Sequence, residues 1–219
     1  MEDITRVTRS KEQAKLNYDK MSKKYDKFGR FERKYKIEGL KILNIAQGEH
    51  ILEIGFGTGS ITEMIANYVG EHGSVDGIDI SEKMKEIAQM KINKENLENR
   101  VKLDTGDACK LPYPPNFFDG IYMSFTLELF DTDEIPAVLE ECYRVLKANG
   151  RLCVISLSKK GKHDKITKIY EWIHGKYPVS IDCRPIYVEQ ALTKSRYKIK
   201  ESKLMNMWGL GVEVVIGVK

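Results

Sequence analysis

The sequence has no long apolar run, and its four cysteines are scattered. No apolar stretch approaches the roughly 18 residues that a membrane-spanning helix needs. The polar first segment, MEDITRVTRSKEQAK, lacks the apolar core of a secretory signal. Cys109, Cys142, Cys153 and Cys183 form no CxxC pair and have no histidine at metal-ligand spacing. We therefore expect a cytoplasmic protein with reduced thiols and no metal site.

The charge is unevenly distributed along the chain, although the net charge is only +4. Residues 1–50 hold 13 Lys and Arg against 8 Asp and Glu, residues 51–150 hold 9 against 18, and residues 151–219 hold 14 against 6. Two interpretations stay open. The basic ends are either solvated helix faces or a surface for an anionic partner, which would include peripheral membrane contact.

Hydrophobic patterning between residues 50 and 158 alternates short apolar runs with amphipathic segments. The runs predict strands over residues 50–55, 74–80, 101–107, 117–125 and 151–158. Helices are predicted over 60–69, where Ser60 and Glu63 form a capping box, after the cap residue Ser81, and over 133–147, ended by Gly150. This order predicts a mostly parallel sheet covered on both faces.

The C-terminal part follows a different pattern. Residues 164–174 and 188–194 are predicted helices, and residues 198–208 and 211–219 are predicted strands of an antiparallel hairpin at one sheet edge. The whole chain therefore predicts an α/β fold, doubly wound, with a mostly parallel seven-stranded sheet and an antiparallel C-terminal edge hairpin. Residues 11–46 are a basic, helical lead-in that contains several aromatic residues.

The segment LEIGFGTGS at 52–60 is the strongest functional signal, because it joins a predicted strand to a predicted helix. Gly55, Gly57 and Gly59 allow a sharp turn and a close approach of a ligand to the backbone N–H groups. The spacing is GxGxG after the acidic Glu53, whereas a dinucleotide-binding loop has GxGxxG. The pattern favours a nucleoside with an amino-acid tail; a tight structural turn is the alternative.

Two acidic residues follow the next two strands. Asp79 ends the second strand, where a carboxylate accepts hydrogen bonds from ribose hydroxyls, and Asp107 follows the third, where a carboxylate can accept from an adenine amino group. Because ligands bind at the carboxyl ends of strands in open α/β sheets, these residues and the glycine loop predict one site.

As a set, these motifs resemble those of class I S-adenosylmethionine-dependent methyltransferases. Within that superfamily the chain is similar to the ubiquinone/menaquinone-biosynthesis C-methyltransferase group, through NYDKMSKKYDKF (17–28), GDACKLPYPPNFFDGIYMSFTLELF (106–130) and EECYRVLKANGRLCVISLS (140–158). The resemblance extends over about residues 14–219. It implies a Rossmann-like methyltransferase fold, S-adenosylmethionine as the cofactor, and methyl transfer to a small or lipid-like acceptor, which would be quinone-like, a phospholipid or another small molecule.

The resemblance also implies roles for residues and segments. Residues 1–46 would form a helical lid, residues 47–219 would form the cofactor-binding domain, and residues 159–197 would enclose the acceptor pocket. The expected contacts run from the methionine part of the cofactor to its ribose, adenine and sulfonium: Glu53, Gly55, Phe56, Gly57, Gly59, Asp79, Ile80, Asp107, Ala108, Ser124 and Phe125. Tyr25 is expected to reach the cofactor's carboxylate and is counted as a catalytic candidate as well.

Methyl transfer from a sulfonium depends mainly on proximity and orientation, but a carbon or hydroxyl acceptor must also lose a proton. Glu128 is the candidate base; the alternative is a solvated helix residue. His163 and His174 are either catalytic or surface histidines. Tyr18 and Tyr25, seven residues apart, form either an aromatic lid or ordinary packing.

The predicted loop at residues 183–185 contains one further candidate. Arg184 either meets an anionic group of the acceptor or belongs to a structural turn set by Pro185. Cys183 is not expected to act as a nucleophile, because methyl transfer needs no covalent step.

The sequence bears differently on several other functions. A nucleic-acid amino-methyltransferase places an Asn/Asp-Pro-Pro-aromatic tetrad after the fourth strand, where this chain has Met123-Ser124-Phe125-Thr126, so no nucleic acid is expected as a partner. A non-catalytic S-adenosylmethionine-binding protein and a methyltransferase acting on protein or RNA stay as alternatives. The glycine spacing disfavours a nicotinamide dehydrogenase. The oligomeric state stays open.

Overall fold

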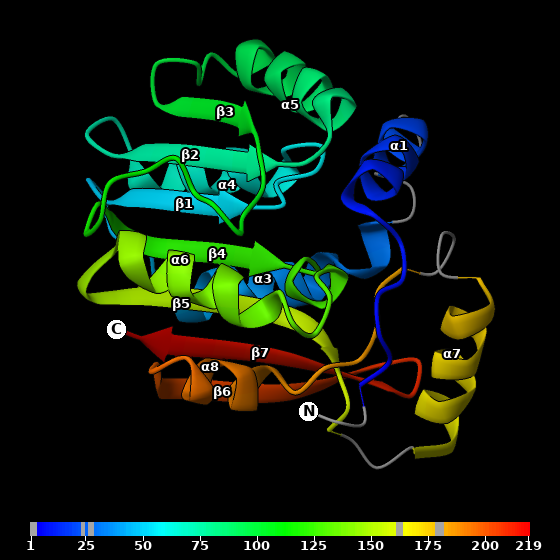
Figure 1. Cartoon of the computed structure of the whole chain (residues 1–219). Helices are drawn as coiled ribbons and strands as arrows, with labels where there is room; N and C mark the ends of the chain where they lie inside the picture. Colours follow the sequence, from blue (N-terminus) through cyan, green and yellow to red (C-terminus); the bar gives the residue numbers. More distant parts are fainter. Residues whose placement is uncertain (1–3, 23–24, 26–28, 161–163, 178–181) are drawn as a thin grey trace.

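The computed structural model describes residues 4–22, 25, 29–160, 164–177 and 182–219. Within these residues, seven strands form one sheet in the order β3-β2-β1-β4-β5-β7-β6 (Figure 1). The strands are β1 (His50–Ile54), β2 (Ser74–Asp79), β3 (Val101–Thr105), β4 (Phe118–Ser124), β5 (Leu146–Ser158), β6 (Lys198–Met207) and β7 (Leu210–Val218). The first five pair in parallel, whereas β7 is antiparallel to both β5 and β6. The predicted fold class is confirmed.

Helices cover both faces of the sheet, as Figure 1 shows. The helices are α1 (Lys11–Met21), α3 (Arg33–Leu43), α4 (Ser60–Val69), α5 (Glu82–Lys94), α6 (Ile135–Val145), α7 (Asp164–Lys176) and α8 (Val188–Lys194), with 3-10 turns η2 (Gly29–Phe31) and η3 (Leu127–Leu129). One buried cluster joins the strands to α6 and α8, and a second joins them to α3, α4 and α5. The near-continuous apolar strands are therefore buried on both sides, as parallel strands require.

Two local predictions need correction. The helix α4 is capped by Gly59, whose φ of 78° and ψ of 10° already place Ser60 inside the helix, so Ser60 does not form the capping box. The helix over 133–147 ends at Val145, not at Gly150, because Leu146 is extended and pairs with Phe118 as the first residue of β5. The predicted cap at Ser81 is confirmed: its hydroxyl accepts a 3.1 Å hydrogen bond from Met84 N.

The carboxyl ends of the parallel strands meet at one edge of the molecule. The N-terminal segment, α1 and α7 lie at this edge, and so does the turn between β6 and β7, because Ser158 at the end of β5 pairs with Gly211 (Figure 1). None of the helices in the described part of the chain is long and apolar enough to cross a membrane.

Candidate active site

The glycine loop between β1 and α4 is shaped by its backbone. Gly55 (φ 74°), Gly57 (φ 54°) and Gly59 (φ 78°) all adopt left-handed conformations, which favour glycine. A Cβ on Gly55 would collide with the Thr126 side chain, and one on Gly59 would lie 2.8 Å from the Ala88 Cβ. Glycine is therefore needed at both positions for conformation and for space.

Asp79, the last residue of β2, fixes this loop to the next helix. Its Oδ2 accepts a 2.8 Å hydrogen bond from Gly57 N, and its Oδ1 accepts a 2.9 Å bond from Ser81 N. Burial raises the pKa of Asp79, although these backbone N–H groups oppose the rise by stabilising the carboxylate. The carboxylate is thus oriented at the carboxyl edge of the sheet, and each oxygen keeps a lone pair for a ligand.

Glu53 lies within β1, directly before the loop, and only 2% of it is exposed. Burial raises its pKa to about 8, and a 2.6 Å hydrogen bond from Thr62 Oγ1 opposes the rise. A positively charged ligand group near this carboxyl would stabilise its ionised form.

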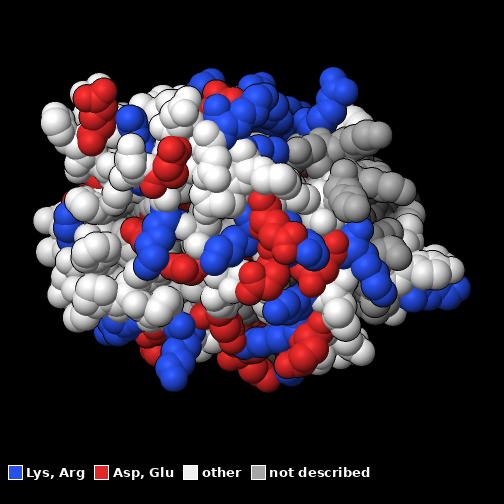
Figure 2. Space-filling model, turned by 90° about the horizontal axis from the view of Figure 1, so that it is seen from above, with Lys and Arg blue, Asp and Glu red and all other residues white. Residues whose placement is uncertain are grey.

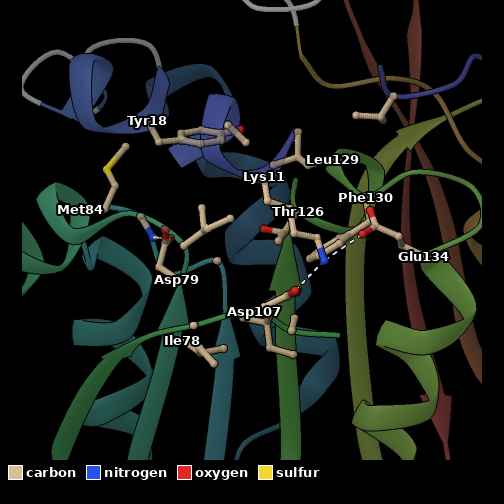
Figure 3. A pocket seen from close by; sticks show the side chains of 18 of the residues that line it. Lys11, Tyr18, Ile78, Asp79, Met84, Asp107, Thr126, Leu129, Phe130 and Glu134 are labelled. Carbon is tan, nitrogen blue, oxygen red and sulfur yellow. Dashed lines mark hydrogen bonds and ion pairs between the residues drawn. The ribbon is translucent and has the colours of Figure 1, made fainter. Parts of the chain in front are cut away.

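A cavity, called here the first cavity, opens between the strand ends and the N-terminal segment. Its lining includes Gly55, Gly57, Asp79, Ile80, Asp107, Ala108, Phe125 and Tyr25, all of them predicted site residues. Figure 3 shows Asp79 and Asp107 facing this space from below, with Tyr18 and Lys11 above them. The structure therefore brings together residues from four strand ends and from the lead-in.

Asp107 is already engaged inside the first cavity. Its Oδ2 accepts a 2.5 Å hydrogen bond from Lys11 Nζ, which also contacts Glu134 Oε1 at 2.9 Å (Figure 3). Partial burial would raise the pKa of Asp107, but the hydrogen bonds from Lys11 and from Cys109 N outweigh it and lower the pKa. This carboxylate is thus paired with a cation from the lead-in.

Further polar contacts hold residues 4–22, called here the cover, over the strand ends. Arg6 pairs with Asp131, Arg9 Nη1 lies 2.9 Å from Asp182 Oδ2, and the Tyr18 hydroxyl donates a 2.5 Å bond to the same carboxylate. Seen from above, acidic and basic side chains intermingle near the centre of the molecule, with a group of basic ones along one margin (Figure 2). Part of the charge asymmetry along the chain is therefore used in intramolecular pairs.

A second cavity lies on the other side of the glycine loop. Three predicted cofactor contacts, Glu53, Phe56 and Ser124, line this cavity and not the first one, and Phe56 also packs over Gly77. Tyr25 borders both cavities, and its ring lies 6.4 Å from that of Tyr18 in an edge-to-face arrangement. The basic residues Arg30, Arg33 and Lys36 complete the lining beside Glu53.

Two predicted site residues lie outside both cavities. Gly59 is the N-cap of α4 and permits its close packing on Ala88. Glu128 is fully buried in η3, so the interpretation as a solvated residue is wrong. Leu157 N donates a 3.2 Å hydrogen bond to its Oε1, and burial raises its pKa to about 8.

The remaining candidates are placed as follows. His174 is 3% exposed on α7, and His163 lies outside the described residues. Arg184 is fully buried, and its guanidinium donates to the Phe130 carbonyl at 2.5 Å and to Thr132 Oγ1 at 3.3 Å. Burial lowers the pKa of Arg184 to about 10. The Cys183 carbonyl accepts a 3.0 Å bond from the Tyr170 hydroxyl.

Arg9, Lys11 and Asp182 are site residues that the sequence reasoning missed. Arg9 and Lys11 line the first cavity, and Asp182 anchors the cover. For Arg9 and Lys11 the signal was the excess of basic residues over 1–50 beside the acidic excess over 51–150, and we interpreted the basic ends as solvated faces or a partner surface. Asp182 lies in the basic segment 151–219, where no such signal pointed to it. Neither interpretation anticipated pairing within the chain.

Comparisons with known proteins agree with this geometry. A family model described as a methyltransferase domain matches residues 51–150. The demethylmenaquinone methyltransferase of Symbiobacterium thermophilum is 34% identical over 148 residues, which are 65% of this chain and 58% of that protein. The demethylmenaquinone methyltransferase of Listeria welshimeri is 33% identical over 147 residues, which are 65% of this chain and 61% of that protein. The match thus spans less than two thirds of the length of these curated relatives.

A solved structure extends the likeness to almost the whole chain. The crystal structure of an S-adenosylmethionine-dependent methyltransferase from Aquifex aeolicus superimposes with a TM-score of 0.69 at 25% sequence identity. The superposition covers 91% of this chain and 97% of that one. The likeness in fold therefore extends well beyond residues 51–150, which the family model matches.

Proposed function

Because the chain belongs to the class I S-adenosylmethionine-dependent methyltransferases, we propose that it transfers the methyl group to a small, lipid-like acceptor. The observation that carries the proposal is the first cavity, where the glycine loop, Asp79 and Asp107 converge at the carboxyl ends of adjacent strands. The relatives named demethylmenaquinone methyltransferases support a quinone-like acceptor, and phospholipid-like molecules form the second class to test.

In the proposed binding mode, Asp79 accepts hydrogen bonds from the ribose hydroxyls. Ile80 and Ala108 pack on the adenine, and Asp107 accepts from its amino group. The methionine tail lies along the glycine loop, with its ammonium group toward Glu53. Two features support this mode: Asp79 is held in place by two backbone N–H groups, and Glu53 is a buried carboxyl whose ionised form a nearby ammonium group would stabilise.

The acceptor is proposed to approach the sulfonium from the side of Phe125, with the cover and residues 159–197 closing over it. Phe125, Leu129 and Phe130 give the first cavity an apolar wall next to the glycine loop. Such a wall suits an apolar acceptor, because burying apolar surface contributes about 25 cal/mol per Å². Tyr25, which borders both cavities, is proposed to lie between them, beside the cofactor's carboxylate.

The displacement itself needs an in-line approach and exclusion of water, which the cavity walls supply. Glu128 is the proposed base for acceptors that lose a proton, because its Oε2 accepts no hydrogen bond from the described residues and its pKa of about 8 suits proton uptake near neutral pH. It lies behind the lining of the first cavity, so the η3 turn must shift when the acceptor binds.

The first test is calorimetric titration of the purified protein with S-adenosylmethionine, S-adenosylhomocysteine and NAD. The proposal expects binding of both sulfur nucleosides and none of NAD. Transfer of a labelled methyl group to a short-chain naphthoquinol or to a phospholipid then distinguishes the acceptor classes. Binding without transfer to any acceptor would favour the non-catalytic alternative, and absence of binding would overturn the proposal.

A further inference from the structure

Five large apolar side chains are exposed close to the carboxyl edge of the sheet. They are Phe31 (58% exposed), Ile166 (40%), Ile169 (59%), Trp172 (62%) and Trp208 (69%), and they are called here the apolar patch. The rings of Phe31 and Trp208 are stacked edge to face at 4.8 Å, and Ile166 abuts Gly209 in the β6–β7 turn. The patch therefore joins η2, the hairpin turn and α7.

Two features indicate that the exposure of these side chains is not a by-product of core packing. Helix α7 already has an inward face, where Tyr170 bonds to Cys183 and His174 is buried, so Ile169 and Trp172 are turned away from it toward solvent, and Ile166 lies between the two sides. Trp208 occupies the hairpin turn with a φ of 51°, a conformation that is unfavourable for a bulky residue. The chain thus keeps an aromatic residue at a position that offers it no burial.

The charges around the patch are predominantly of one sign. Among the described residues, no ion pair involves Arg30, Arg33, Lys168 or Lys176, and the Lys176 ammonium lies 4.5 Å from the Trp172 ring centre. The neighbouring acidic groups are compensated, because Glu32 pairs with Lys36 at 2.8 Å and Glu171 with Lys159 at 3.1 Å, while Glu38 pairs with Lys203 at 2.8 Å. The patch is therefore apolar with a cationic rim.

The patch also adjoins the candidate site. Arg30 and Arg33, on either side of Phe31, line the second cavity together with Gly55 and Gly57. The β6–β7 turn and α7 lie at the same edge of the sheet as the first cavity (Figure 1). A molecule leaving a surface in contact with the patch would have a short path to the glycine loop.

We propose that the apolar patch and its cationic rim dock onto the surface of an anionic lipid bilayer. Exposed Trp, Phe and Ile residues flanked by Lys and Arg match the apolar boundary and the anionic headgroups of such a surface. A second copy of this chain fits less well, because two like-charged rims would face each other. The inference rests on the proposed lipid-like acceptor and assigns the surface from which that acceptor enters.

The test is co-sedimentation of the full chain with vesicles of phosphatidylcholine alone and of phosphatidylcholine mixed with phosphatidylglycerol. We expect binding to the mixed vesicles only, and about tenfold weaker partitioning for Trp172→Ala and for Lys168→Glu. The matched controls lie on α5: Met90→Ala, where Met90 is 64% exposed, and Lys94→Glu, also at an exposed position. Both controls are expected to partition like the parent chain.

Four results would overturn the inference: no binding to mixed vesicles, equal binding to the two vesicle types, equal effects of the Trp172 and Met90 changes, or a dimer in size-exclusion chromatography that Trp172→Ala dissociates. The last result would assign the patch to a second copy. Vesicle binding is measured without cofactor and cofactor binding without vesicles, so failure of this inference and failure of the proposed function are distinguishable.

Discussion

The strand ends and the cover surround the same cavity but are held by different forces. The strand ends are fixed by backbone hydrogen bonds, such as Gly55 N to Ile78 O at 2.8 Å and Phe125 N to Ile155 O at 2.7 Å. The cover depends largely on side-chain pairs, among them Lys11 with Asp107, whose side chains are 40% and 38% exposed, and its helix α1 has no buried residue. Solvent-accessible pairs of this kind contribute about 0–1 kcal/mol each and weaken with salt.

This difference suggests a division of labour. A site for a cofactor needs fixed donors and acceptors, which the strand ends supply at no cost in side-chain ordering. In its proposed role as a lid, the cover would admit the ligand and close again, which favours contacts that break singly. Changes at the strand ends should therefore be costly and insensitive to salt, and changes in the cover should be small and salt-dependent.

The largest expected effect concerns Glu128 and the pH dependence of stability. Its pKa of about 8 in the folded chain exceeds the ordinary value, so the folded state binds a proton that the unfolded state has lost. This contribution is present below the unfolded pKa and is lost as pH rises through the folded pKa. From pH 5 to pH 8 the parent chain should lose roughly 3 kcal/mol of unfolding free energy through Glu128, at about 1.4 kcal/mol per pKa unit, and Glu128→Gln should not show this loss.

Urea unfolding at both pH values measures this difference. Glu140→Gln is the matched control, because Glu140 is exposed on α6 and should leave the pH dependence unchanged. A Glu128→Gln variant that loses as much stability as the parent between pH 5 and pH 8 would show that the carboxyl is ionised in the folded chain.

The second effect sharpens the comparison at the cofactor. Asp79→Ala should weaken S-adenosylmethionine binding by roughly 2–3 kcal/mol, or about 30- to 150-fold, because charge-assisted hydrogen bonds to two hydroxyls are lost. Asp79→Asn keeps one acceptor oxygen and should lose less. Asp76→Ala, on the same strand but outside both cavities, is the control for calorimetric titration. An unchanged dissociation constant in Asp79→Ala would remove the ribose assignment.

Alanine substitutions at two glycines compare a tightly packed position beside the strand ends with an open position elsewhere. Gly59→Ala places a Cβ 2.8 Å from the Ala88 Cβ at a φ of 78°, and should cost roughly 1–2 kcal/mol of stability. Gly29→Ala, in the η2 turn, meets nothing within 4 Å and should cost a few tenths of a kcal/mol at most. Thermal unfolding of the two variants tests the contrast; equal losses would mean that the packing of α4 on α5 yields to a methyl group.

The sequence predicted the strand-end region well because its signals are local. An apolar run, a glycine triplet and an acidic residue after a strand each depend on a few neighbouring residues, and Gly55 and Asp79 do converge on the first cavity. The fold class followed from the alternation of the same local patterns.

The misses lie where distant residues decide the outcome. The contact of Lys11 with Asp107 joins residues 96 positions apart, and that of Arg9 with Asp182 joins residues 173 apart. No periodicity encodes such pairs. The burial of Glu128 likewise depends on β5, whose Leu157 N–H reaches it from 29 residues away. The cap of α4 was also misassigned. The left-handed conformation of Gly59 is a backbone property that the sequence does not show, and Ser60 is of a residue type that often caps helices.

The smallest expected effect tests the cover itself. Lys11 occupies the Asp107 oxygen that is proposed to accept from adenine, so Lys11→Ala should tighten S-adenosylmethionine binding at low salt by less than about fivefold, within the 0–1 kcal/mol of an exposed pair. At high salt the parent chain should approach the variant, because screening weakens the same pair. Lys20→Ala, exposed on the same helix, is the control for titrations at both salt concentrations. Weaker binding in Lys11→Ala would reverse the interpretation, since it would show that the ammonium group helps the cover to hold the cofactor.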